Sequence, residues 1–274
     1  MKPLVVYEAK AGQSHLQDAL RDLREGIQRH VIWRELVRRD LYNRTKGASL
    51  GRWWIVIGQA IAIAGIGFVY ANLFNVPLNS YLPYLATGLV TWGYIVSLIN
   101  EASDVFVFSK GYLTQTRLPL SICVFRFVTR NMLLFAYKSS IIVATLLVFQ
   151  VPVGWTAPLA LVGVLLIAAA GFFTGVILGL LNARYRDIGQ LVTSLTVFLF
   201  FVTPVFWRPD RLGDFSWIVD YNPLFHFVSL VRSPLLGDPI DGWSFMMTGG
   251  TIAVLALIAS LVYKFMGREV IYWL

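Results

Sequence analysis

The sequence predicts an all-α integral membrane protein with six transmembrane helices, and two observations on composition and hydropathy support this. Of the 274 residues, 57% are hydrophobic and 14% are charged, with a mean hydropathy of +0.66, whereas soluble domains carry about 25% charged residues. A helix needs about 20 apolar residues to cross the bilayer core. Six stretches have that length, at 53–74, 81–105, 122–149, 157–181, 188–207 and 243–266.

The distribution of Lys and Arg predicts that both termini are cytoplasmic. Residues 1–52 contain 11 of the 23 basic residues, and the connections 106–121 and 182–187 contain two each. The two connections between these basic segments contain none. Basic connections stay on the cytoplasmic side. Residues 1–52 are therefore expected to form a cytoplasmic segment ahead of a six-span domain, 53–268.

The cytoplasmic segment ends in a predicted amphipathic helix, "HVIWRELVRRDLYNRTK". Trp33 and Asp40 share one face with apolar residues, whereas Arg34, Arg38 and Arg39 lie on the opposite face. Arginine opposite Trp and Leu is typical of a helix that lies in the membrane interface, in contact with lipid. The alternative is a helix that packs its apolar face on a partner.

The segment between spans five and six, 208–242, is too long for a turn and too apolar for a solvated loop. It contains three arginines and five aspartates, and this negative balance is consistent with the outer side. Asn222 before Pro223 is typical of a helix N-terminus, and Pro234 predicts an end at Arg232. Since about ten residues cannot cross a bilayer, we expect short re-entrant helices buried against protein; a surface cap is the alternative.

Several classes of chemistry are absent from the sequence. It contains no GxxxxGK[ST] phosphate loop, no HExxH and no GxSxG, so we expect no catalytic residue, no metal site and no cofactor in this chain. The single cysteine excludes an intramolecular disulfide. The net charge of +8 flanks the apolar runs without forming one patch, which argues against a nucleic-acid partner.

Two sets of residues within the spans are candidates for function. Arg126 and Arg130 lie one turn apart in span three, with Glu101 and Asp104 at matching depth in span two, although each charge at that depth costs about 2.5–3.5 kcal/mol. They form either an internal ion-pair cluster or a polar stripe that meets an anionic ligand such as a phosphate. The second set is aromatic and would either stack on sugar rings in a channel or form interfacial belts: Tyr70, Trp92, Phe198, Phe201 and Trp207.

Several stretches resemble the permease subunit of type-2 ABC exporters, in the branch that exports O-antigen, capsule or teichoic acid glycans. They are "WRELVRRDLYNRTKGASLGRWW", "YLPYLATGLVTWGYIVSLINEASDVF" with "LTQTRLPLSI", "NARYRDIGQLV", "TPVFW" and "NPLFHFVSLVR". Their order and spacing cover most of residues 30–270. One departure is that the family often has a proline early in span one, where this chain reads "IVIGQAIAI".

The resemblance implies a homodimer in the bacterial inner membrane, bound to two copies of a separate ATPase subunit that holds ATP and magnesium. Spans one and five would line a conduit for a lipid-linked glycan. The short turn before span five would dock on the ATPase; a plain positive anchor is the alternative. The coupling residues would be Asn182, Arg184, Tyr185, Arg186 and Asp187.

Two other functions stay open at this point. The first is a type-2 exporter of a smaller lipid or drug. The second is a membrane-embedded polyprenyl-phosphate enzyme, which would need converging carboxylates with a metal or a general base. Asp210, Asp214 and Asp220 are the outer carboxylates available for such a role, but a charged loop is usually solvated.

Overall fold

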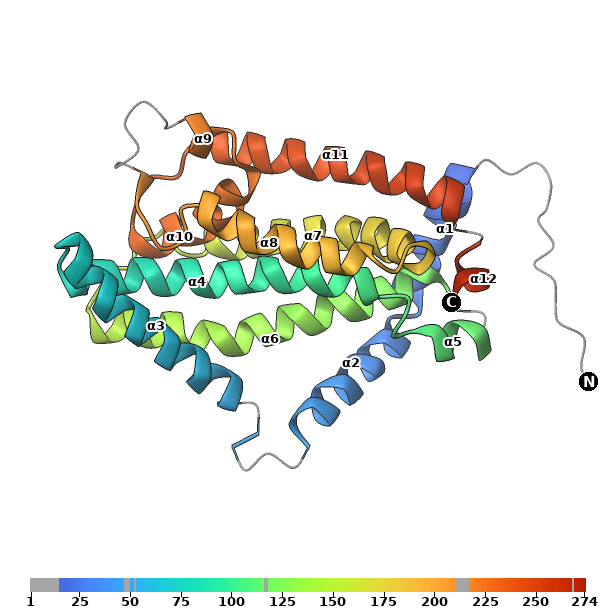
Figure 1. The fold of residues 1–274 in the computed structure, drawn as a ribbon, viewed down its shortest axis with the longest axis horizontal. Coiled ribbons are helices and arrows are strands. Elements are labelled where there is room, and N and C mark those ends of the chain that lie inside the picture. Colours follow the sequence, from blue (N-terminus) through green and yellow to red (C-terminus); the bar gives the residue numbers. More distant parts are fainter. Residues whose placement is uncertain (1–14, 47–49, 52, 116–117, 210–216, 268) are drawn as a thin grey trace, which may run out of the picture.

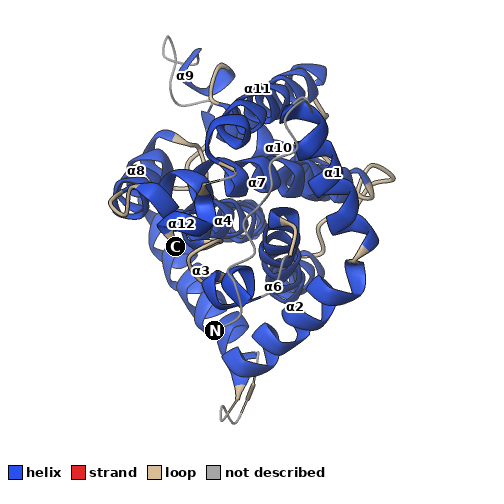
Figure 2. Cartoon of the chain, turned by 90° about the vertical axis from the view of Figure 1, so that its right-hand side faces the viewer, coloured by secondary structure: helices blue, strands red, loops and turns tan. Residues whose placement is uncertain are grey.

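The chain is all helical in the computed structural model, which describes residues 15–46, 50–51, 53–115, 118–209, 217–267 and 269–274. Within those ranges it contains helices and no strand (Figure 1, Figure 2). The elements are α1 (His15–Gln28), α2 (His30–Thr45), α3 (Trp53–Phe74), α4 (Leu78–Asn100), the 3₁₀ helix η1 (Glu101–Asp104), α5 (Lys110–Gln115), α6 (Leu120–Val148), α7 (Leu159–Arg184), α8 (Ile188–Val202), α9 (Trp217–Asp220), α10 (Pro223–Leu236), α11 (Gly242–Met266) and α12 (Val270–Trp273).

Five helices are long and apolar enough to cross a membrane, namely α3, α4 with η1, α6, α7 and α11. They coincide with five of the six expected spans, with ends shifted by a few residues. The sixth, α8, is apolar but has 15 residues, or about 22 Å of helix at 1.5 Å per residue. The hydrocarbon core is about 30 Å thick, so the helical part of α8 alone is shorter than a full crossing.

The helix within the expected fifth span, 188–207, ends at Val202, before the end of the apolar run. Thr203 is extended, with φ −93° and ψ 129°. It precedes Pro204, and the proline ring disfavours helical geometry in the residue before it. The chain nevertheless stays inside the protein, since residues 203–205 are buried. The apolar pattern is therefore correct, but the last part of the segment is non-helical.

Helix α4 lies at the centre of the bundle. Of its apolar 18-residue stretch, 67% is buried inside the protein, whereas the corresponding share for α11 is 11%. Helix α4 contacts α3, α6, α7, α8 and α10 (Figure 1). Glycines on α7 permit close packing, which small residues favour between membrane helices. A Cβ at Gly171 would lie 2.8 Å from Leu98, and one at Gly179 would lie 2.9 Å from Phe106. Helices α3 and α11 leave most of their apolar surface exposed.

The bundle has two distinct ends. One, here named the α12 end, contains α1, α5, α12 and the α7–α8 turn (Figure 1, Figure 2). The other, the α9 end, contains α9, α10 and the α3–α4 and α6–α7 connections (Figure 1). The first and last described helices therefore lie at the same end.

Helix α10 confirms the expected N-terminus but not the expected end. The Asn222 side chain accepts hydrogen bonds from the backbone N–H groups of Leu224 and Phe225. The helix runs through Pro234 to Leu236 and ends at Gly237, which adopts φ +75°. It packs on α4, α7 and α11, and this burial outweighs the hydrogen bond that Pro234 cannot donate, a cost of about 3 kcal/mol.

Thiol labelling tests the crossing of α8. Cys123 is the chain's only cysteine and is buried, whereas Ser80, Asp187 and Asp241 are exposed. If α8 and residues 203–207 cross together, an impermeant maleimide labels Ser80→Cys and Asp241→Cys in intact cells. Asp187→Cys then reacts only after permeabilisation. Opposite sidedness of positions 80 and 241 would mean that this segment does not cross.

Candidate functional site

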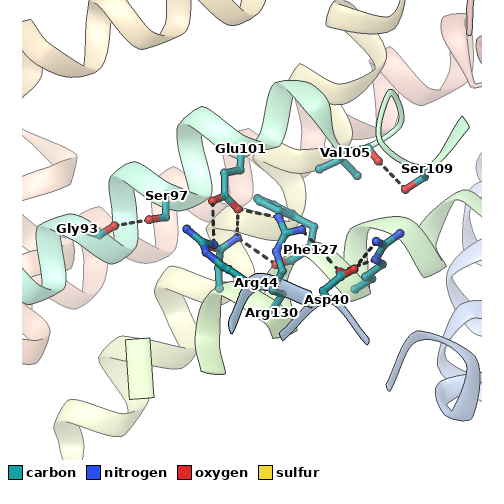
Figure 3. A network of polar contacts seen from close by, with 11 residues as sticks. Asp40, Arg44, Gly93, Ser97, Glu101, Val105, Ser109, Phe127 and Arg130 are labelled. Carbon is teal, nitrogen blue, oxygen red and sulfur yellow. Dashed lines mark hydrogen bonds and ion pairs between the residues drawn. The ribbon is translucent and has the colours of Figure 1, made fainter. Parts of the chain in front are cut away.

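A partly buried charge network joins α2, η1 and α6 (Figure 3). Arg126 on α6 grips the Asp40 carboxylate of α2 with two parallel hydrogen bonds, from Nε at 2.7 Å and from Nη2 at 2.6 Å. The two side chains are only 14% and 17% exposed. Paired forks of this kind are the strong form of ion pair, so the contact holds α2 against the start of α6.

Arg130, one turn further along α6, connects Asp40 to Glu101. Its Nη2 donates to Glu101 at 2.7 Å, and its Nη1 lies 3.7 Å from Asp40 (Figure 3). Asn131 donates to the same Glu101 oxygen at 2.9 Å, and Arg44 lies 4.0 Å from its other oxygen. Two arginines of α6 are thus matched by two carboxylates, with Arg44 at the edge.

This network differs in part from the expected cluster. The pairing of Arg130 with Glu101 agrees with the sequence, but the structure pairs Arg126 with Asp40 instead of an acid of span two. Asp104 lies outside the network, with its carboxylate 3.4 Å from the Asn182 amide. The sequence signal for Asp40 was its place on the apolar face of an amphipathic helix.

The network leaves little room for an anionic ligand. The adjacent cavity, lined by Glu101, Asn131 and Lys138 among others, has a volume of about 30 Å³, which suits a water molecule. Among the described residues, Arg130 Nε has no hydrogen-bond partner. In this arrangement the guanidinium groups bind carboxylates of the same chain, and the cavity is smaller than a phosphate headgroup.

The rest of α2 divides as the amphipathic pattern predicts. Arg34, Arg38 and Arg39 are exposed, and the last two pair with Glu35 on the surface. Trp33 stacks on Phe125 of α6, with ring centroids 5.9 Å apart. The apolar face thus packs on α6 of the same chain.

Helix α1 is anchored to α6 by a carboxylate. Asp22 accepts hydrogen bonds at 2.9 Å from the backbone N–H groups of Leu120 and Ser121, which begin α6 and lack partners within that helix. Burial raises the pKa of Asp22, although these bonds act in the opposite direction. The first turn of α6 is thereby completed from another helix, a contact that the sequence reasoning missed.

The α7–α8 turn is shorter than the sequence implied, because α7 continues to Arg184. Asn182 is buried; its amide donates to the Ser103 carbonyl at 3.0 Å and accepts from Gly189 N–H at 3.0 Å. Asn182 therefore connects η1, α7 and α8, and it is not part of the exposed surface of the turn. The other expected coupling residues are exposed: Arg184, Tyr185, Arg186 and Asp187.

The C-terminal helix α12 lies beside this turn, which the sequence reasoning missed. Arg186 donates to the Trp273 carbonyl at 3.3 Å. The Arg184 guanidinium lies 5.2 Å from the Trp273 ring and 5.4 Å from the Tyr185 ring. The only available signal was the aromatic tail "IYWL". The exposed surface at this end therefore combines the turn with α12; we name it the turn surface.

Some of the candidate channel aromatics pack into a ring cluster inside the bundle, and two others lie exposed on α8. Tyr70 on α3 and Trp92 on α4 join one ring cluster through Phe206 and Phe200, with centroids 5.6 Å and 5.9 Å apart respectively. Phe201 contacts Phe200 at 5.5 Å, and Trp207 donates to the Phe201 carbonyl at 3.3 Å. Phe198 and Phe201 are each 62% exposed. Trp92 is buried, so α8 alone presents open aromatic faces from this set.

At the α9 end, side chains of α4 and α10 hold the non-helical segment 203–207. They donate to four consecutive carbonyl groups, and we name this arrangement the carbonyl clasp. Non-helical backbone at membrane depth is tolerated only where protein or water satisfies it. The bonds are Arg232 Nη1 to Pro204 (3.1 Å), Arg232 Nη2 to Val205 (2.8 Å), Tyr81 Oη to Phe206 (2.6 Å) and Tyr84 Oη to Trp207 (2.9 Å).

Comparison with known proteins agrees with this architecture. The profile of a family described as ABC-2 type transporter matches residues 32–236. An O-antigen export system permease protein RfbA of Klebsiella pneumoniae is 26% identical over 194 residues, covering 69% of this chain and 74% of the relative. Another from the same organism is 24% identical over 240 residues, covering 84% and 92%. The Myxococcus xanthus protein of that name is 24% identical over 221 residues, covering 78% and 82%.

Substitution of Asp40 tests the charge network. Asp40→Ala leaves Arg126 buried without its carboxylate and should cost about 3 kcal/mol of stability, measured as a lower unfolding midpoint of the purified protein. Glu35→Ala on the same helix removes only surface pairs and should cost less than about 1 kcal/mol. The double variant Asp40→Ala/Arg126→Ala should recover part of the loss. Equal midpoints for Asp40→Ala and Glu35→Ala would contradict a structural role.

Proposed function

The chain belongs to the ABC-2 type transporter family, and we propose that it is the permease of an ATP-driven exporter of a lipid-linked, O-antigen-like polysaccharide. In this proposal two copies of the chain assemble with two copies of a separate ATPase subunit. The complex lies in the bacterial inner membrane, with both termini of the permease on the cytoplasmic side. ATP and magnesium bind to the partner and not to this chain.

The proposed substrate class is supported by the proteins to which the chain is similar. Three proteins named as O-antigen export permeases match most of the chain, one of them over 84% of it and over 92% of its own length. The multi-pass helical bundle is the architecture that a permease needs.

We propose the turn surface as the docking site of the ATPase. Helix α7 runs without interruption into the turn, and buried Asn182 joins it to η1 and α8 through two hydrogen bonds. A displacement of the exposed residues Tyr185–Asp187 is therefore transmitted to η1, α7 and α8 together. A stiff connection of this kind can pass a movement of the partner to the spans.

The conduit in this proposal forms where α3 and α8 of two copies face one another. Both helices leave apolar surface open in the single chain, including Phe68 on α3 and Phe198 and Phe201 on α8. Aromatic faces bind sugar rings by stacking without fixing one particular sugar. An exporter of a small lipid or drug, the second function in this family, would not depend on those rings in the same way.

Charge reversal in the turn tests the coupling. In membranes containing the permease and its ATPase, Arg186→Glu should lower glycan export by roughly tenfold, within the range of about 5–150-fold that coupling energies of 1–3 kcal/mol give. ATP turnover should change, while the amount of inserted protein should not. Lys264→Glu makes the same charge change on exposed α11 and should leave export unaltered.

A second variant tests whether the substrate is a glycan that stacks on the aromatic rings of α8. Phe198→Ala/Phe201→Ala should impair glycan export and leave ATP turnover in place, because the rings lie away from the turn surface. Full glycan export by this double variant would contradict an aromatic conduit.

For the turn, unaltered export and unaltered ATP turnover in Arg186→Glu would mean that it serves only as a topological anchor.

A further inference from the structure

A pocket of about 650 Å³ opens at the α9 end, on the side away from the turn surface. It lies between the start of α4, the connection after α6 and one side of α10. Pockets of about 300–1,000 Å³ are typical of small-molecule sites. The charged residues among its lining are Arg208, Arg232 and Asp238, so two cations face one carboxylate and the formal balance is +1.

Within the described part of the chain, the positive charge in this pocket has little compensation. Arg232 is only 4% exposed, and within the described part of the chain it has no ion-pair partner. Its Nη atoms bind the carbonyl groups of Pro204 and Val205, which are dipoles and carry no net charge. Its Nε has no hydrogen-bond partner among the described residues, and the same holds for Arg208 Nε.

Both guanidinium groups are positioned by the ring of Tyr84. The centre of the Arg232 group lies 3.9 Å from the ring centroid, and that of Arg208 lies 5.2 Å from it. Gly88, one turn further along α4, makes room for this arrangement, because a Cβ there would collide with Arg232 Nη2. Two like charges are therefore brought to one aromatic ring on a fixed backbone, and both line the pocket.

The remaining lining has the character of a site for an amphiphile. Ser229 and Ser233 lie one turn apart on α10, with their Oγ atoms 3.2 Å apart, and both face the pocket. Hydroxyl groups and guanidinium forks are the donors that suit phosphate oxygens. The apolar part of the lining suits an alkyl chain and includes Phe149, Val151, Phe225 and Leu236.

We propose that this pocket binds the phosphate or pyrophosphate headgroup of an amphiphile at the α9 end of the bundle. Arg208 contacts the headgroup, and Ser229 and Ser233 donate to its oxygens. Arg232 supplies charge from behind while it keeps the carbonyl clasp closed. The inference is independent of the proposed export, because it concerns binding and requires no transport.

Direct binding tests the pocket in the purified full chain, in an uncharged detergent. The probes are farnesyl pyrophosphate, dihexanoyl phosphatidylglycerol and inorganic pyrophosphate, and the readout is Kd by thermophoresis. Arg208→Gln should weaken binding of the preferred amphiphile roughly tenfold, because a charge-assisted contact is lost. Ser229→Leu should weaken it at least as much by filling the pocket, although both arginines remain.

The control is Arg34→Gln, which removes an exposed charge from α2 and should leave Kd unchanged. Preference for farnesyl pyrophosphate assigns a prenyl pyrophosphate, and preference for the other lipid assigns a membrane phospholipid. If inorganic pyrophosphate binds as tightly as the two amphiphilic probes, the proposal that the ligand is an amphiphile is overturned. Absence of binding, or an unchanged Kd in Arg208→Gln and Ser229→Leu, would overturn the site.

Discussion

Neutralisation of arginine inside the bundle is the constraint on which the arrangement of α2, α4 and α6 depends. Two arginines on one face of α6 are costly to bury without a counter-charge, and each pairs with a carboxylate from a different helix. Asp40 comes from α2, which precedes every span, and Glu101 comes from η1, directly after α4. The N-terminal helices are therefore integrated into the transmembrane bundle, although their composition is that of a separate polar segment.

The spans were predictable because burial in lipid and burial in protein impose the same apolar composition on the sequence. The helix N-terminus at Asn222 was predictable too, since capping depends on a local pair of residues. The end of α8 and the end of α10 both involve proline, with opposite outcomes. Pro204 stops a helix where the following residues find donors from α4 and α10, whereas Pro234 is tolerated where packing holds the helix on both sides.

The partners of polar side chains were the least predictable feature. Asp40 and Arg126 are 86 positions apart in the sequence, and helical periodicity gives the face of each residue but not the helix that covers it. The same limit applies to Asn182, whose place in a charged stretch indicates a surface although its side chain is buried. The non-helical form of segment 203–207 and the packing of α12 were not predicted, because their contacts come from residues distant in sequence.

The carbonyl clasp has a consequence for biosynthesis. Its acceptors at positions 204–207 leave the ribosome well before Arg232, which satisfies two of them. A nascent chain that has inserted α8 but not α10 thus holds exposed backbone acceptors with only the two tyrosines of α4 as donors. Folding of the segment after α8 is therefore completed by residues downstream of it, and a chain truncated before α10 would present this stretch to quality-control proteases as an unfinished segment.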